Sequence, residues 1–463
     1  MDLEREKTNE IKALIEETKE NCKTLIALGD SIKELDKMLL NEAKGSSLES
    51  FYERVPDMLK GFVELVYDLN NHPSIRLMES LIYRFYYTDN HQEIALSKID
   101  GDFRKFVFST PRVRQDDEIY LQIPFSDQRW DVFFKHRQYP CELQDLIKLL
   151  DITDHQAPLF ESFFTTDIPK QNDDRNYQGD GVRIRYFGHA CVLVETASTS
   201  ILFDPVISYA VENNIPRYSF DDLPDSIDYV VITHSHLDHV MFETLLQLRH
   251  KVRNIVFPSN QKGTLADPSL KLILKHVGFG SLLEMDELET IKFTDGEILT
   301  IPFLGEHCDL NIRTKLSYCV NIRGKRLLFA ADSNNLAENL YDHIFNITGP
   351  IEMLFIGMEC EGAPLTWVYG ALLTNQLSRE FDRSRTLCGS NCSKAWSIIQ
   401  KLKCKQVYVY AMGQEPWLNH VMGLNYSPDS PQIIESDNLI SMCRKNDIES
   451  ERLFGKKEWL INI

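Results

Sequence analysis

The chain lacks several features that would define its class. No apolar run is long enough to cross a membrane, and the first residues, MDLEREKTNE, are too charged for a signal peptide. Basic residues are in deficit, because 50 Lys and Arg face 69 Asp and Glu, for a net charge of −19. This balance argues against nucleic-acid binding. The 10 cysteines form no CxxC pair. We therefore expect a cytoplasmic protein with reduced thiols and no membrane partner.

The chain does contain enough apolar residues for more than one core. Its 463 residues are 43% hydrophobic, and this length favours two domains. A polar, glycine-containing segment, PKQNDDRNYQGDG at residues 169–181, separates regions of different pattern. We predict a mixed α+β N-terminal domain at residues 1–175 and a catalytic domain at residues 176–463.

The predicted N-terminal domain contains no catalytic motif. Apolar residues recur at steps of three and four through residues 5–40, which predicts an amphipathic helix. Such a helix either covers its own domain or pairs with a second copy to form a homodimer. Further along, SIRLMESLIYRFYY is typical of a helix and EIYLQI of a strand.

The predicted catalytic domain alternates short apolar strands with turns and a few helices. Examples are the strands ILFDP, NIVFPS and EMLFIGME, and the helical stretches at residues 242–250 and 394–403. Strands with helices between them predict sheets covered by helices, an α/β class of fold.

One strand of this domain ends in four side chains of the kind that bind metals. The strand DYVVI runs into THSHLDHV, which holds His234, His236, Asp238 and His239 within six positions. A spacing of two lets alternate side chains point the same way, so His234 and His236 are expected on one metal. Asp238 and His239 are then available to a second, and the set suits zinc, iron or manganese. A solvated polar loop is the alternative, but such clusters rarely arise by chance.

Further ligands are expected at other strand ends along the same edge. The segment FLGEH ends in Glu306 and His307, LLFAAD ends in Asp332, and the loop QEPWLNH reaches His420. Asp332 closes an apolar run, where an unpaired carboxylate is costly, and a metal would explain its presence. Capping of the turn at SNN is the alternative.

These motifs resemble those of the metallo-β-lactamase superfamily. HSHLDH matches its HxHxDH signature, and YFGHACVLVE, ILFDP and LLFAADS resemble its strands. The resemblance extends from about residue 182 to the C-terminus. It implies an αββα sandwich with a two-metal site at one edge, in which Asp332 bridges the metals.

Glu306 departs from the common superfamily pattern. Most members have a histidine after the glycine that matches Gly305, whereas here His307 comes one residue later. Either the register slips and His307 is the ligand, or Glu306 replaces it. Together with GMECEGAPLTW and YAMGQEPWLNHVM, Glu306 resembles the metallo-β-lactamase-fold diiron β-hydroxylases of non-ribosomal peptide pathways, which also carry an extra N-terminal domain. By that resemblance Glu306 binds the first metal, and Glu306 and Asp332 belong to the catalytic centre.

The resemblance implies an enzyme of antibiotic biosynthesis. It would use two iron ions, O2 and an external electron donor to hydroxylate the β-carbon of an amino acid. The amino acid would be held as a thioester on the carrier domain of a non-ribosomal peptide synthetase. A carboxylate in place of imidazole adds charge and hard oxygen donors, which favours ferric iron, whereas zinc hydrolysis needs no redox change. The alternatives are a dizinc hydrolase, which Glu306 opposes, and a non-catalytic binding protein, which the intact ligand set opposes.

Several neighbouring residues have two interpretations. His189, in FGHAC, either lines the site or, as we expect, is a packed structural histidine. Glu359, Cys360 and Glu361 end the strand EMLFIGM and are expected in the pocket wall rather than on a metal. Trp367, Tyr369 and Trp417 form an aromatic wall or pack in the core. The segment 378–396 is a candidate docking site for the carrier domain through four basic residues, Arg379, Arg383, Arg385 and Lys394. The N-terminal domain is the other candidate, and a solvated surface is the alternative for both.

Overall fold

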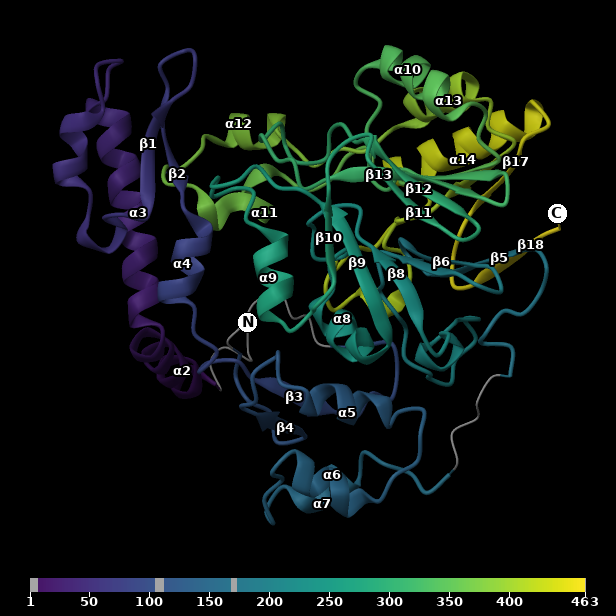
Figure 1. The fold of residues 1–463 in the computed structure, drawn as a ribbon, viewed down its shortest axis with the longest axis horizontal. Coiled ribbons are helices and arrows are strands. Elements are labelled where there is room, and N and C mark those ends of the chain that lie inside the picture. The colour runs from purple at the N-terminus through teal and green to yellow at the C-terminus, as the bar shows by residue number, and fades with distance from the viewer. Residues whose placement is uncertain (1–6, 105–111, 168–172, 463) are drawn as a thin grey trace.

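A computed structural model of the chain describes residues 7–104, 112–167 and 173–462. The N-terminal part has two small hydrophobic clusters of its own. It lies beside a larger body that is built on two sheets (Figure 1). Each of these sheets has seven strands. Within the described residues, no helix is both long and apolar enough to cross a membrane.

The first sheet contains the strand that leads into the histidine cluster. In spatial order it consists of β10 (Leu282–Met285), β9 (Val252–Pro258), β8 (Ile227–Val231), β7 (Ser200–Phe203), β6 (Cys191–Glu195), β5 (Val182–Gly188) and β18 (Lys457–Ile461). The second sheet consists of β11 (Thr290–Phe293), β12 (Gly296–Pro302), β13 (Leu316–Ile322), β14 (Lys325–Phe329), β15 (Met353–Ile356), β16 (Gln406–Val409) and β17 (Glu449–Arg452).

The main core lies between the two sheets. Phe203 of the first sheet stacks on Phe329 of the second, with ring centroids 3.9 Å apart, and Phe329 stacks in turn on Phe355. Strands β5, β6 and β7 are buried along their whole length. Their continuous apolar sequences follow from this arrangement, because both faces of each strand are covered.

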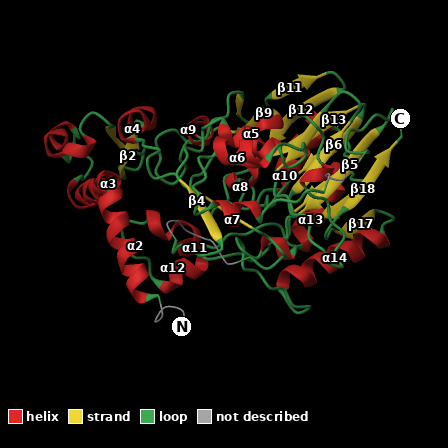
Figure 2. Cartoon of the chain, turned by 90° about the horizontal axis from the view of Figure 1, so that it is seen from below, coloured by secondary structure: helices red, strands yellow, loops and turns green. Residues whose placement is uncertain are grey.

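Helices cover the outer face of each sheet and complete an αββα sandwich. Helices α8 (Phe242–Leu248) and α9 (Leu270–His276) pack on the first sheet. Helices α10 (Glu338–Thr348), α13 (Cys392–Leu402) and α14 (Pro431–Lys445) pack on the second, and α13 and α14 lie along one side of the strands in Figure 2. The predicted fold class is confirmed, as are the helices expected near residues 242–250 and 394–403.

The helix predicted at residues 5–40 is divided in two. Helix α2 (Thr8–Asn21) and helix α3 (Lys23–Glu42) meet at Cys22, whose ψ of 15° is not helical. Only α3 is anchored to a core, through Leu28, Leu35 and Leu39, whereas α2 buries no residue. Among the described residues, a buried core therefore fixes only α3. Residues 5 and 6 lie outside the described residues.

The prediction of a helix over SIRLMESLIYRFYY is wrong in its first part. Those residues form β2 (Pro73–Leu77), which pairs antiparallel with β1 (Val63–Tyr67), and only α4 (Glu79–Tyr86) is helical. Pairing with β1 satisfies the backbone there, and this overrides the local helical pattern. The strand predicted at EIYLQI is confirmed as β4 (Glu118–Leu121), paired with β3 (Ile94–Ser97).

The remaining elements are short helices. In the N-terminal part they are η1 (Glu49–Arg54), η2 (Asp57–Leu59), α5 (Arg129–Lys135), α6 (Leu143–Leu149) and α7 (Ala157–Glu161). In the sandwich they are η3 (Phe220–Asp222), η4 (Arg249–Lys251), α11 (Leu365–Tyr369), η5 (Gly370–Leu372), α12 (Arg379–Ser384) and η6 (Pro416–Leu418). Of these, α11 matters most for function, because its last residue reaches the candidate site.

Polar contacts join the N-terminal part to the sandwich. Asp102 forms an ion pair with Arg217, and Arg104 reaches Glu243 at 2.9 Å. The boundary predicted at residue 175 stays a prediction, because residues 168–172 are not described and β5 begins only at Val182.

Candidate metal centre

Six of the seven predicted ligands lie together where strands of the two sheets end. The loop after β8 carries four of them, and single residues come from the segments after β12 and β14. Because these strand ends meet at one edge of the sandwich, residues far apart in the sequence face one another. The six are His234, His236, Asp238, His239, Glu306 and Asp332.

His234, His236 and Glu306 form a first group. Nε2 of His234 lies 3.1 Å from Nδ1 of His236, and Oε1 of Glu306 lies 3.4 Å from the same Nδ1. Two ring nitrogens and a carboxylate oxygen therefore converge on one point. This arrangement suits a single cation held by two imidazoles and one carboxylate.

Asp238, His239 and Asp332 form a second group. Asp332 also lies next to the first group and so connects the two. Its Oδ2 lies 3.0 Å from Nε2 of His239 and 3.5 Å from Nε2 of His234. Oδ2 of Asp238 lies 3.6 Å from Nε2 of His239. The carboxylate of Asp332 is thus placed between the two groups, which is the position of a bridging ligand.

Unpartnered buried atoms test whether these residues fit metal ions. Among the described residues, three buried atoms of the cluster form no hydrogen bond: Oε2 of Glu306, Oδ1 of Asp332, and Nε2 of His239, which faces Asp332 at 3.0 Å without forming one. Buried polar atoms are nearly always paired, so atoms left over within one cluster call for a cation. The donor set of imidazoles and carboxylates fits two such ions.

The carboxyl groups of the site also call for positive charge. Burial and the neighbouring Glu359 and Asp332 raise the pKa of Glu306 well above its usual range. Burial, followed by the charges of Asp332 and Asp238, raises the pKa of Glu359 to about 8. Crowded, buried carboxylates resist ionisation, and bound metal ions reverse that balance.

Hydrogen bonds outside the cluster fix two of the histidine rings. Nδ1 of His239 lies 2.8 Å from Oδ2 of Asp204, and the Thr233 hydroxyl donates to the same oxygen at 2.6 Å. Nδ1 of His234 lies 3.1 Å from that hydroxyl. Both rings therefore turn Nε2 toward the site, as outer contacts of metal ligands commonly do. Sequence reasoning missed this role of Asp204, although an aspartate closing the buried strand ILFDP was a usable signal.

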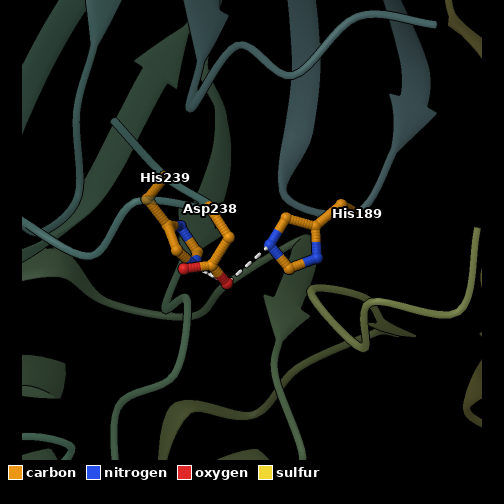
Figure 3. Close-up of side chains that lie close together, drawn as sticks. All are labelled: His189, Asp238 and His239. Atoms are coloured by element: carbon orange, nitrogen blue, oxygen red, sulfur yellow. Dashed lines mark hydrogen bonds and ion pairs between the residues drawn. The ribbon is translucent and has the colours of Figure 1, made fainter. Parts of the chain in front are cut away.

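His189 holds Asp238 rather than offering a ligand atom of its own. Its Nε2 lies 3.1 Å from Oδ2 of Asp238 (Figure 3). The backbone N–H of Gly413 donates to Nδ1 of His189 at 3.2 Å, so the ring hydrogen is on Nε2 and points at Asp238. His189 is buried, as expected of a packed histidine, but it also orients a predicted ligand.

Unusual backbone conformations gather around the site. Glu306 has φ +70°, His189 has φ +51°, and Ala331, next to Asp332, has φ +44°. Non-glycine residues in this left-handed region carry strain of about 1 kcal/mol or more, and such strain concentrates at functional sites. Gly357 leaves room for the bridge, because a Cβ there would lie 2.5 Å from Oδ1 of Asp332.

His420 does not join the cluster. The guanidinium of Arg104 lies 2.9 Å from its Nε2, and the ring is outside the candidate ligand groups found among the described residues. Burial, followed by the charge of Arg104, lowers the pKa of His420 to about 4. A neighbouring cation disfavours a metal at this nitrogen, so we replace the prediction of a ligand with that of a contact to the N-terminal part.

Glu306, rather than His307, faces the first group. Nδ1 of His307 lies 2.6 Å from the hydroxyl of Tyr369, and His307 supplies no atom to the ligand groups. The structure therefore favours Glu306 over the slipped register. Glu359 lies close enough to Glu306 to raise the pKa of that carboxyl group, which agrees with its expected place in the pocket wall.

The three aromatic residues have different surroundings. Tyr369 contacts the site, whereas Trp417 is buried in a small cluster that includes Val206 and Leu418. Trp367 is 59% exposed. The three do not form one continuous wall.

Comparisons with known proteins agree with this architecture. A family model described as the diiron non-heme beta-hydroxylase N-terminal domain matches residues 1–168, and a beta-lactamase superfamily domain matches residues 199–362. The 4-amino-L-phenylalanyl-CmlP-peptidyl-carrier-protein 3-hydroxylase of Streptomyces venezuelae is 35% identical over 452 residues, which are 96% of this chain and 84% of that protein.

A solved structure and a shorter relative extend these matches. The crystal structure of CmlA, a diiron beta-hydroxylase from Streptomyces venezuelae, aligns with a TM-score of 0.90 at 34% identity, and the match covers 97% of this chain and 85% of that one. A metal-dependent hydrolase of Opitutus terrae is 30% identical over 152 residues, which are 33% of this chain and 63% of that protein. The long relative is matched across both parts of the chain, the short one over a third of it. The chain therefore belongs to the family of diiron non-haem β-hydroxylases.

Proposed function

We propose that the chain is an O2-dependent monooxygenase that hydroxylates the β-carbon of an amino acid. The amino acid is carried as a thioester on the carrier domain of a non-ribosomal peptide synthetase. One oxygen atom of O2 enters the C–H bond and the other leaves as water, with two protons and with two electrons from an external donor. The observation that carries the proposal is Glu306 at the first group, where a hydrolase of this superfamily commonly has a histidine.

Each predicted ligand has a distinct part in this proposal. His234, His236 and Glu306 would hold the first iron, Asp238 and His239 would hold the second, and Asp332, which lies between the two groups, would serve both. When bound, the iron pair supplies the redox chemistry that O2 activation requires. Asp204, Thr233 and His189 keep ligand side chains oriented, and Glu359 adds a carboxyl group beside Glu306.

The charge of the site supports iron rather than zinc. Four carboxyl groups, those of Asp238, Glu306, Asp332 and Glu359, lie in or beside the cluster. Hard, anionic oxygen donors stabilise the ferric state, and carboxylate-rich iron pairs are familiar in O2 activation. A dizinc hydrolase gains nothing from the additional charge.

The outer face of α11 and α12 is our candidate for carrier docking. Two of the four predicted basic residues are committed elsewhere, because Arg385 donates to the Cys308 carbonyl and Lys394 to Asn334. Arg379 and Arg383 remain exposed, beside Phe381, which is 65% exposed. A chain of net charge −19 repels an acidic carrier domain at long range, so docking needs a local patch of this kind. The nearby α11 ends at Tyr369, which touches the site.

Helix α2 is our candidate for a homodimer contact. It is amphipathic in sequence yet buries no residue, and Ile15 is 46% exposed. Pairing of α2 with the α2 of a second copy would cover this apolar stripe. Ile15→Glu should convert a dimer to a monomer in analytical ultracentrifugation, and a wild-type chain that sediments as a monomer excludes the contact.

The metal and the reaction can be tested together. Protein made in iron-sufficient medium should contain about two iron ions per chain and little zinc. After chemical reduction and exposure to O2, it should hydroxylate a carrier-loaded amino acid in a single turnover. The free amino acid should react far more slowly, because the carrier and its pantetheine arm supply binding that orients the β-carbon. Zinc-loaded protein that instead cleaves the thioester would establish the hydrolase.

The variant Glu306→His provides the matched control. It restores the common superfamily ligand, so we expect folded protein with a larger zinc share and no oxygenase activity. Unchanged iron content and turnover in this variant would remove the main support for the proposal.

A further inference from the structure

The hydroxyl of Tyr369 lies between two histidine rings at the edge of the site. It is 3.2 Å from Nε2 of His236 and 2.6 Å from Nδ1 of His307. The tyrosine is only 7% exposed, although it stands at the end of the short helix α11. Its surroundings are the apolar cluster that includes Ile312, Leu365 and Leu387. Apolar packing explains why the ring of Tyr369 is buried, but it does not explain why its hydroxyl points at the two histidines.

The positions of the hydrogens follow from the other contacts of the rings. Nδ1 of His236 faces Nε2 of His234 and Oε1 of Glu306, so its lone pair is needed by the first group. The hydrogen of His236 is then on Nε2 and is donated to the Tyr369 oxygen. The Tyr369 O–H in turn donates to Nδ1 of His307, which must be the acceptor. In this chain of hydrogen bonds, His236 donates to Tyr369, and Tyr369 donates to His307.

We propose that Tyr369 is a positioning residue for the first group, with His307 as the acceptor that fixes its hydroxyl. The pattern repeats what is seen at the other rings, where Thr233 and Asp204 face the outer nitrogens of His234 and His239. Each ring thereby keeps one tautomer and presents its free nitrogen inward. The difference is that Tyr369 comes from α11, whereas Asp204 directly follows β7 and Thr233 lies two residues after β8.

This role explains two features of the chain. It gives Nδ1 of His307 a function without making that atom a ligand, while Nε2 of His307 is buried without a hydrogen-bond partner among the described residues. It also makes α11 part of the support of the first group, so displacement of α11 would release His236. The inference requires a metal at the first group but not that the metal is iron. Its failure is therefore distinguishable from failure of the proposed function.

The test is the metal affinity of Tyr369→Phe, which removes the hydroxyl and keeps the ring. We expect the affinity of the first group for Co2+ to fall about 10- to 100-fold in competition with a chelator, the usual effect of losing such a contact. The visible spectrum of the Co2+-loaded protein should change as the ring of His236 reorients. The matched control is Tyr408→Phe, which removes another buried tyrosine hydroxyl, bonded to Gln406 and Glu449. It should keep the wild-type affinity and spectrum.

A second variant separates positioning from ligation. His307→Gln keeps an acceptor for the Tyr369 hydroxyl and should bind Co2+ more tightly than His307→Ala does. Wild-type affinity and spectrum in Tyr369→Phe would reduce Tyr369 to a packing residue and overturn the proposal. Complete loss of the first metal in His307→Ala, with little effect of Tyr369→Phe, would make His307 a ligand and overturn it as well.

Discussion

At the scale of single residues, the candidate centre depends on a few atoms that have no other partner. Oδ1 of Asp332 is buried without a hydrogen bond, while Oδ2 lies near both His234 and His239. Gly357 leaves the space in which this carboxylate sits. The cost of burying such a carboxylate is offset only if cations bind it, so we expect its removal to affect both metals.

Replacement of Asp332 should therefore lower the metal content. We expect Asp332→Ala to retain one metal ion per chain or fewer, and His234→Ala to deplete the first group preferentially. Elemental analysis after gel filtration measures this directly. His420→Ala is the control, because His420 contacts Arg104 instead, and it should retain about two ions. Two metals in Asp332→Ala, or their loss in His420→Ala, would contradict the ligand set.

At the scale of elements, a charged cluster pins β5 to β6 inside the sandwich. Arg183 and Arg185 of β5 each donate to the carboxylate of Glu195 on β6, with Nε at 3.0 Å in both cases. All three side chains are 2% exposed. The same two strands flank the turn that carries His189, so this cluster also supports one side of the site.

Removal of the carboxylate from this cluster should destabilise the fold strongly. Glu195→Ala leaves two buried guanidinium groups without their shared anion, which costs about 3–5 kcal/mol in comparable cases. Urea unfolding monitored by circular dichroism provides the measurement. Glu352→Ala is the control, because its ion pair with the exposed Lys405 is worth less than about 1 kcal/mol. Equal stabilities of the two variants would show that the buried cluster contributes little.

The helices α11 and α12 support a second prediction at this scale. Arg383→Glu combined with Phe381→Ala should raise KM for the carrier-loaded amino acid at least about tenfold, because both charge attraction and apolar contact are lost. Turnover of a short pantetheine-linked substrate, which has no carrier domain to dock, should be unchanged. A matched surface change elsewhere, Lys405→Glu, should have no effect on either substrate. Equal KM values for the variant and the wild type would show that the carrier domain docks on another surface.

At the scale of the whole molecule, His420 connects the N-terminal part to the sandwich. Arg104 bridges its Nε2 and the carboxylate of Glu243. Burial and Arg104 lower the pKa of His420 from 6.5 to about 4, while Glu243 acts in the opposite direction. As the pH falls from about 6.5 to 4, the unfolded chain takes up a proton at this residue before the folded chain does. Stability therefore decreases with decreasing pH across this window.

This linkage predicts a measurable difference between wild type and His420→Asn. Between pH 7.5 and pH 5, the wild type should lose about 2 kcal/mol more of its unfolding free energy than the variant does. Chemical denaturation of both proteins at the two pH values provides the comparison. Other histidines titrate in both proteins, so only the difference reports on His420. Parallel losses in the two proteins would mean that His420 stays protonated or exposed in the fold.

Sequence patterns and the family resemblance predicted the fold class, which the structure confirms, and most residues of the candidate site. Apolar strands with helices between them indicated sheets covered by helices, and the resemblance to the metallo-β-lactamase superfamily implied the sandwich. HSHLDH placed four ligand-type residues at one strand end. Asp332 was predictable because it closes an apolar run, whereas the choice of Glu306 over His307 came from the resemblance to the diiron β-hydroxylases. The spacing of apolar residues and the position of a residue at a strand end are local properties, so they can be read from short stretches of the chain.

The tertiary structure decided what depends on distant partners. The strand β2 forms in a helical pattern because β1 pairs with it, and the helical pattern of residues 5–40 is interrupted at Cys22, with buried residues in α3 alone. His420 lies outside the candidate ligand groups and contacts Arg104, which is 316 residues away in the sequence. In the same way, Tyr369 meets His236 across 133 residues. Long-range strand pairing and packing decide which side chains meet at a sheet edge. A local sequence pattern does not contain that information.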